Sequence, residues 1–219
     1  MPSKPPESSK LQISKKATRF WPVVSGAVAV VLAAALGLII TLRESSNFID
    51  AEWMAEIVEH RSPLWDAPAL VMSFLGGGWF GVFVLPLAIA VALALTKRKW
   101  AAIYFLAASV GSAGLVQLLK KTLGRARPDE ILIHADFGSF PSGHVANAAT
   151  IAVALAFILR RVWVWFAGAA WVILMALSRT YLGAHWLSDT VGGALLGIGV
   201  AVLLWAPFAR RLEAEDASP

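Results

Sequence analysis

Three short polar clusters interrupt a chain of 219 residues that is otherwise largely apolar. Residues 120–128 carry a lysine seven positions before an Arg-Pro pair, residues 141–144 read Pro-Ser-Gly-His, and residues 178–189 contain Ser-Arg, a histidine and an aspartate. Imidazoles, a carboxylate and several cations are the groups that phosphoryl transfer requires when no metal ion gathers the charge. The clusters therefore predict a phosphate site with its own nucleophile.

The third cluster contains the predicted nucleophile. His185 and Asp189 are four residues apart, a spacing that predicts neighbours on one face of a helix. The carboxylate can then accept a hydrogen bond from one ring nitrogen and leave the other nitrogen free to attack phosphorus. Histidine and carboxylate can also bind zinc, but the clustered cations would repel a metal ion. We therefore expect no catalytic metal and no cofactor.

The remaining polar residues are predicted to bind the phosphate. Lys120 stands about two helical turns before Arg127, so both side chains can converge on one anion. Ser142 and Gly143 open an apolar segment, and the N-terminus of a helix presents free N–H groups to anions. The Ser142 hydroxyl can donate to phosphate or simply cap the helix. Arg179 can reach the same phosphate from the end of the preceding segment.

At residues 120–189 the chain resembles the type 2 phosphatidic acid phosphatase family of membrane lipid phosphatases, including the bacterial undecaprenyl-diphosphate and phosphatidylglycerophosphate phosphatases. It carries the three-part signature of that family complete. The resemblance implies that His144 is the general acid that protonates the leaving group. The family also includes soluble acid phosphatases and vanadium haloperoxidases, so the signature identifies a chemistry before a substrate.

Composition places the chain in a membrane, because 58% of its residues are apolar, 15% are charged and its mean hydropathy is +0.68. A membrane-spanning helix needs about 20 apolar residues. The candidate spans are residues 21–42, 69–96, 100–119, 145–159, 162–177 and 186–205. We therefore predict an all-α, polytopic membrane protein with six transmembrane helices.

Residues 47–60, between the first two spans, have apolar and acidic side chains at helical spacing. This pattern predicts an external helix that lies in the membrane interface. A lid over the phosphate site is the alternative interpretation.

Lysines and arginines precede the first span and follow the second, fourth and sixth spans. Because such loops remain cytoplasmic, both termini are predicted to be cytoplasmic and the three clusters to face outward from the inner (plasma) membrane. Residues 1–20 are predicted to be a disordered basic tail, 21–207 the phosphatase domain and 208–219 a cytoplasmic tail. The net charge of +5 favours contact with anionic membrane lipids, and no nucleic-acid partner is expected.

The leading hypothesis is an enzyme that hydrolyses a lipid phosphate or diphosphate through a phosphohistidine intermediate. Undecaprenyl diphosphate, phosphatidylglycerol phosphate and phosphatidic acid are the substrate classes that the resemblance implies. One alternative is a lipid phosphotransferase, in which a hydroxyl group replaces water at the phosphohistidine. Another is a catalytically silent lipid-binding protein, against which the intact His144, His185 and Asp189 argue. The sequence indicates no oligomeric state.

Overall fold

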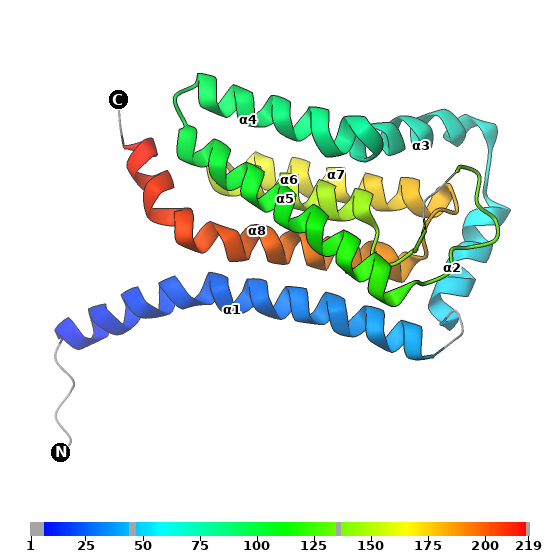
Figure 1. The fold of residues 1–219 in the computed structure, drawn as a ribbon, viewed down its shortest axis with the longest axis horizontal. Coiled ribbons are helices and arrows are strands. Elements are labelled where there is room, and N and C mark those ends of the chain that lie inside the picture. Colours follow the sequence, from blue (N-terminus) through cyan, green and yellow to red (C-terminus); the bar gives the residue numbers. More distant parts are fainter. Residues whose placement is uncertain (1–6, 44–46, 135–136, 218–219) are drawn as a thin grey trace, which may run out of the picture.

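The chain folds as a bundle of helices in a computed structural model, which describes residues 7–43, 47–134 and 137–217. No strand occurs in these ranges. Most of the helices run along the long axis of the molecule, and the shorter α2 lies at one end (Figure 1). The elements are α1 Glu7–Leu42, α2 Phe48–Glu59, α3 Pro63–Gly76, the π-helical η1 Phe80–Val84, α4 Leu85–Leu95, α5 Lys99–Leu123, α6 Gly143–Leu159, α7 Val162–Tyr181 and α8 Leu187–Asp216.

Within the part of the chain that the structure describes, four helical segments are long and apolar enough to cross a membrane, namely Phe20–Leu42, Lys99–Leu123, Val162–Tyr181 and Leu187–Asp216. The pair Pro63–Gly76 and Phe80–Leu95 is bent by 44° and makes a fifth crossing if it counts as one span. Helix α6 is apolar but has only 17 residues. The all-helical class is therefore confirmed, whereas the count of six spans stays a prediction.

The second predicted span is broken where the sequence suggested one continuous helix. Three glycines occupy residues 76–78, and Gly78 has φ +57°, a conformation that residues with a side chain rarely adopt. A Cβ atom on Gly77 would lie 2.0 Å from Nε2 of His144. The break therefore lets the backbone of this span approach the ring of His144.

Helix α8 forms the centre of the bundle and packs against α1, α5 and α6. Close contact with α6 requires a glycine, because a Cβ atom on Gly193 would lie 2.5 Å from the carbonyl oxygen of Ser142. Tyr104 on α5 is fully buried, and its hydroxyl donates a 2.9 Å hydrogen bond to the carbonyl of Ala201 on α8. These contacts fix the ends of α5, α6 and α8 relative to one another.

Both terminal helices extend beyond the predicted spans. Helix α1 begins at Glu7 and continues unbroken into the first predicted span, since residues 7–21 contain neither glycine nor proline to interrupt it. Residues 1–6 of the predicted disordered tail lie outside the described residues. Helix α8 continues to Asp216, and the carboxylate of Glu215 accepts hydrogen bonds from the N–H groups of Trp100 (2.6 Å) and Ala101 (3.1 Å). The last turns of α8 therefore cap the start of α5.

Candidate active site

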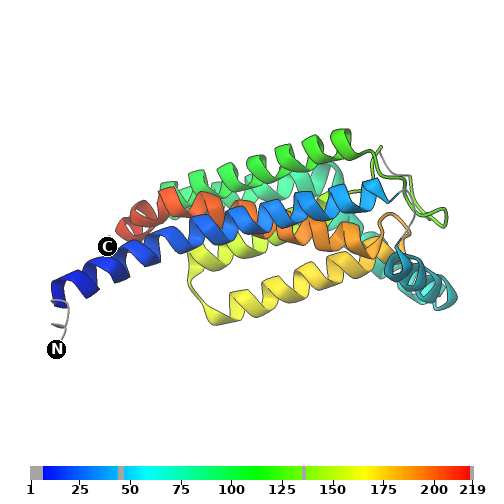
Figure 2. The same ribbon diagram turned by 90° about the horizontal axis from the view of Figure 1, so that it is seen from below.

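All three polar clusters meet at one end of the bundle. There α5 and α7 end, α6 and α8 begin, and α2 lies against the same end (Figures 1 and 2). The backbone joins two of the clusters directly, because the N–H of Ser142 donates a 2.9 Å hydrogen bond to the carbonyl of Asp189. The fold thus collects residues that are up to about 70 positions apart in the sequence.

The structure brings Lys120 and Arg127 together around one backbone carbonyl. Nζ of Lys120 donates to the carbonyl oxygen of Gly138 at 2.6 Å, and Nη2 of Arg127 donates to the same oxygen at 3.1 Å. Nη1 of Arg127 also donates to the carbonyl of Ala184 at 2.5 Å. Helix α5 ends at Leu123, and Gly124 turns the chain with φ +58°. Arg127 therefore reaches the site from a loop and not from a continued helix.

His185 lies beside Asp189, with 3.5 Å between Nδ1 and Oδ2, and both side chains are buried. The expectation that both residues share a helix face is wrong, because α8 begins only at Leu187. Asp189 instead caps that helix, since its Oδ2 accepts a 2.9 Å hydrogen bond from the N–H of Trp186. His185 occupies the preceding loop. Burial lowers the pKa of His185 to about 3, so its ring is neutral and keeps a lone pair.

Arg179 and Ser142 are both buried at this end. Arg179 is 2% exposed, and its Nη1 donates to the hydroxyl of Ser73 on α3 at 2.5 Å. Within the described residues, Nε of Arg179, Oγ of Ser142 and Nδ1 of His185 are buried atoms without a hydrogen-bond partner. Buried polar atoms normally have partners. Nδ1 of His185 faces the carboxylate of Asp189. Ser142 and Arg179 are therefore the predicted site residues whose unpaired atoms are available to a ligand.

His144 and Gly143 form the first turn of α6, after the N-cap residue Ser142. The ring of His144 packs against the glycine break at Gly77. Asn147, one turn further along α6, donates to the carbonyls of Gly76 at 3.2 Å and Gly81 at 2.8 Å. The broken span and the start of α6 thus hold each other in place.

Residues 100–213 match the family model described as the PAP2 superfamily. The chain belongs to this superfamily. It is 30% identical over 128 residues to phosphatidylglycerophosphatase B of Bacillus subtilis, covering 53% of this chain and 63% of that protein. It is 34% identical over 123 residues to lipid A 1-phosphatase of Rhizobium johnstonii, covering 51% of this chain and 50% of that protein. The chain thus spans about half to two thirds of the length of these relatives.

The fold of this PAP2 chain is similar to the crystal structure of a transmembrane PAP2 type phosphatidylglycerolphosphate phosphatase from Bacillus subtilis. The TM-score is 0.71 at 26% sequence identity, and the match covers 83% of this chain and 96% of that one. The family resemblance noted in the sequence is therefore confirmed. Together with the apolar helices, this similarity identifies a membrane protein.

Sequence reasoning about the PAP2 signature missed several residues at the site. The hydroxyl of Ser139 donates a short hydrogen bond to Oδ2 of Asp189. Nη1 of Arg125 donates to Oδ1 of the same carboxylate at 2.5 Å. Ser73 contacts Arg179 from the broken span. The one available signal was the position of Arg125 inside the first cluster, since Ser73 and Ser139 stand outside any cluster.

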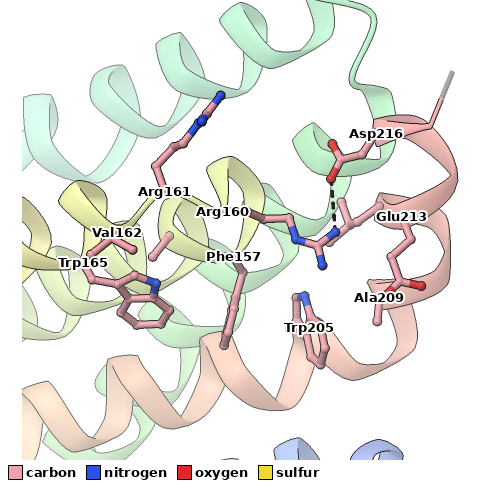
Figure 3. A pocket seen from close by; sticks show the side chains of 11 residues that line it. Phe157, Arg160, Arg161, Val162, Trp165, Trp205, Ala209, Glu213 and Asp216 are labelled. Atoms are coloured by element: carbon pink, nitrogen blue, oxygen red, sulfur yellow. Dashed lines mark ion pairs between the residues drawn. The ribbon is translucent and has the colours of Figure 1, made fainter. Parts of the chain in front are cut away.

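A cavity of about 250 Å³ lies away from the PAP2 signature residues, between the α6–α7 turn and the last turns of α8 (Figure 3). Phe157, Trp165 and Trp205 line it, and Phe157 stacks on Trp205 with 5.1 Å between ring centroids. Arg160 pairs with Asp216 at its edge, with 3.6 Å between Nη1 and Oδ2. This cavity contains none of the predicted catalytic or phosphate-binding residues.

Proposed function

We propose that this chain is a membrane lipid phosphatase that hydrolyses a phosphomonoester or diphosphate through a phosphohistidine on His185. The observation that carries the proposal is that, within the described residues, Oγ of Ser142 and Nε of Arg179 are buried without hydrogen-bond partners at the end of the bundle where His185 lies beside Asp189. The oxygens of a phosphate group would accept hydrogen bonds from the serine hydroxyl and the arginine Nε–H. The names of the relatives, phosphatidylglycerophosphatase B and lipid A 1-phosphatase, support a lipid substrate.

In this proposal the phosphate group binds between the cations and the start of α6. Lys120, Arg127 and Arg179 neutralise its charge, and the N–H of Gly143 and the hydroxyl of Ser142 donate to its oxygens. Preorganised cations of this kind stabilise the charge that develops in the transition state. They perform the role that Mg²⁺ has in kinases, so the scheme requires no metal ion.

The first chemical step would be attack by Nε2 of His185 on phosphorus. The new P–N bond forms as the P–O bond to the lipid breaks, and the electron pair of that bond stays on the leaving oxygen. His144 donates a proton to this oxygen. Asp189 lies beside Nδ1 of His185 and stabilises the positive charge that the ring gains on phosphorylation.

The second step would release inorganic phosphate. His144, now neutral, accepts a proton from water as the water oxygen attacks phosphorus. The P–N bond breaks, and its electron pair returns to His185. The same residues therefore serve both steps, and the enzyme is restored.

We further propose that six spans cross the inner membrane and that the active-site end faces outward. Helix α6 is short but largely buried by its neighbours, so it need not meet lipid along its whole length. Arg98 and Arg160 both pair with Asp216 at the end of α8, away from the phosphate site. Basic residues at that end favour a cytoplasmic position for both termini.

The test is phosphate release by the purified protein in EDTA, measured with phosphatidylglycerol phosphate, phosphatidic acid and undecaprenyl diphosphate. We expect release from at least one of these substrates and background release from the His185→Ala protein. Activity that disappears in EDTA and returns with Mg²⁺ or Zn²⁺ would contradict the metal-free scheme. Equal release by the wild-type and His185→Ala proteins would contradict the assigned nucleophile.

A further inference from the structure

Asp50 is a buried carboxylate on α2, the short helix that lies at the active-site end of the bundle (Figure 1). It stands in the first turn of that helix, and Asn47 accepts a 2.8 Å hydrogen bond from its N–H. Only 1% of Asp50 is exposed, although the acids Glu52, Glu56 and Glu59 on the same helix are exposed. A carboxylate is rarely buried unless it is paired. Its partners therefore indicate its role.

Arg125 joins Asp50 to the catalytic carboxylate. Its Nη2 donates to Oδ2 of Asp50 at 2.7 Å, and its Nη1 donates to Oδ1 of Asp189 at 2.5 Å. The Arg125 side chain is 8% exposed, and its guanidinium carbon lies 5.6 Å from the centre of the Trp186 ring. One planar guanidinium group thus spans two buried carboxylates, one from α2 and one from α8.

Ser188 completes the connection between α2 and α8. Its N–H donates to Oδ1 of Asp50 at 2.8 Å, and its hydroxyl donates to Oδ2 of Asp50 at 2.5 Å. Nη1 of Arg125 also donates to the Ser188 hydroxyl at 2.8 Å. The side chain of Asp50 therefore accepts three hydrogen bonds. One comes from Arg125, which also contacts Asp189, and two come from Ser188, which precedes Asp189 in the sequence.

Each oxygen of Asp189 has a distinct set of neighbours. Oδ1 accepts from Arg125, whereas Oδ2 accepts from Ser139 and from the N–H of Trp186 and faces Nδ1 of His185. A partial rotation of this carboxylate would move Oδ2 away from Nδ1 of the histidine. The contact with Arg125 opposes that rotation. The position of Arg125 depends in turn on its second partner, Asp50.

We propose that Asp50 is a positioning residue for phosphoryl transfer, acting through Arg125 to orient Asp189 and limit the neutralisation of its charge. This inference rests on the function proposed above. With Asp50 present, the positive charge of Arg125 is shared between two carboxylates. Without it, the guanidinium group is a buried cation with one side of its fork unpaired. The cation then neutralises Asp189 more fully or moves, and either change weakens the support that Asp189 gives to His185.

The test compares Asp50→Asn with Glu52→Gln, which removes the same charge from an exposed position on the same helix. We expect Asp50→Asn to lower kcat by about 10- to 100-fold, the range seen when partners that orient an active-site group are removed. KM should change by less than about twofold, because Asp50 lies outside the proposed phosphate-binding set. Glu52→Gln should match the wild-type protein in both quantities.

A double-mutant cycle with Arg125→Lys separates positioning from a general structural effect. Lysine keeps a positive charge but lacks the fork that bridges two carboxylates. If Asp50 acts through Arg125, the double variant should be no slower than the slower single variant, within about twofold. If the fold losses in kcat of the two single variants multiply in the double variant, the proposal is wrong. A folded Asp50→Asn protein with wild-type kcat would also overturn it.

Arg125→Lys alone decides the matter if Asp50→Asn does not purify as a folded protein. A lower kcat at unchanged KM supports the bridge, and a wild-type kcat contradicts it. Failure of this inference is distinguishable from failure of the proposed function. In the first case the wild-type protein releases phosphate and the bridge variants match it, whereas in the second case the wild-type protein releases none.

Discussion

At the scale of single residues, the two histidines of the site are held by different surroundings. His185 is buried in the loop before α8, with a carboxylate 3.5 Å from its Nδ1. His144 is partly buried on the first turn of α6 and packs against the backbone of Gly77. A carboxylate neighbour suits a nucleophile that becomes positively charged, whereas a ring placed against a glycine is positioned by shape.

Replacing Gly77 with alanine should disturb His144 without touching the proposed phosphate ligands. The new Cβ atom would lie 2.0 Å from Nε2 of the ring, so the ring must move. We expect kcat to fall by about tenfold or more, because small displacements of a catalytic group are costly. Gly114→Ala is the matched control, since a Cβ atom there has no neighbour within 4 Å. Phosphate release checks both variants, and equal activity would show that this contact does not position His144.

The sequence predicted which polar residues come together at this end of the bundle, but it did not predict several of the residues that hold them in place. Spacing brought His185 and Asp189 together correctly, yet it assigned both to one helix because it could not show that Asp189 caps α8. Arg125 and Asp50 are 75 residues apart, and nothing in either segment specifies the other. Local patterns predict helices and local pairs, whereas such long-range contacts arise only from packing.

At the scale of helices, hydropathy predicted where the apolar spans lie but did not predict where a span is interrupted. Residues 69–96 are apolar almost throughout, so they predict one continuous helix, although the structure divides them at the glycine triplet. The sequence also did not predict that α8 extends to Asp216, because the last turns of this helix are polar. Their packing depends on Glu215, which caps α5.

Glu215→Ala should destabilise the bundle, because it leaves two N–H groups at the start of α5 without their carboxylate partner. We expect a loss of about 1–2 kcal/mol, which corresponds to a fall of a few degrees in Tm. Glu213→Ala, an exposed acid one half-turn away, should leave Tm unchanged. Thermal unfolding in detergent measures both variants. If the wild-type and Glu215→Ala proteins have identical melting curves, Glu215 does not stabilise the bundle by capping α5.

At the scale of the whole molecule, the two ends of the bundle differ in chemistry. One end carries the three polar clusters and α2, and the other carries Arg98, Arg160 and Asp216 together with an aromatic cavity. The separation agrees with the distribution of lysine and arginine along the sequence. It supports an outward-facing active site and cytoplasmic termini.

Cysteine labelling tests this orientation directly, because the natural chain has no cysteine. Lys99→Cys and His134→Cys place exposed thiols at opposite ends of the bundle. In intact cells, an impermeant thiol reagent should label the His134 variant and leave the Lys99 variant unlabelled until the cells are opened. Labelling of the Lys99 variant from outside would reverse the orientation and place the active site in the cytoplasm.

Trapping of a ³²P-labelled, acid-labile phosphoenzyme shows whether His185 is the nucleophile. The wild-type protein should form it from a labelled lipid phosphate, and His185→Ala should form none. His144→Ala loses only the proton donor, a contribution of about 10² to 10⁴ in rate. It should therefore recover labelling with an activated aryl phosphate, whose leaving group departs without protonation. A labelled His185→Ala protein would show that His185 is not the nucleophile. Labelling with the aryl substrate that is lost only in His144→Ala would show that His144 forms the covalent bond instead.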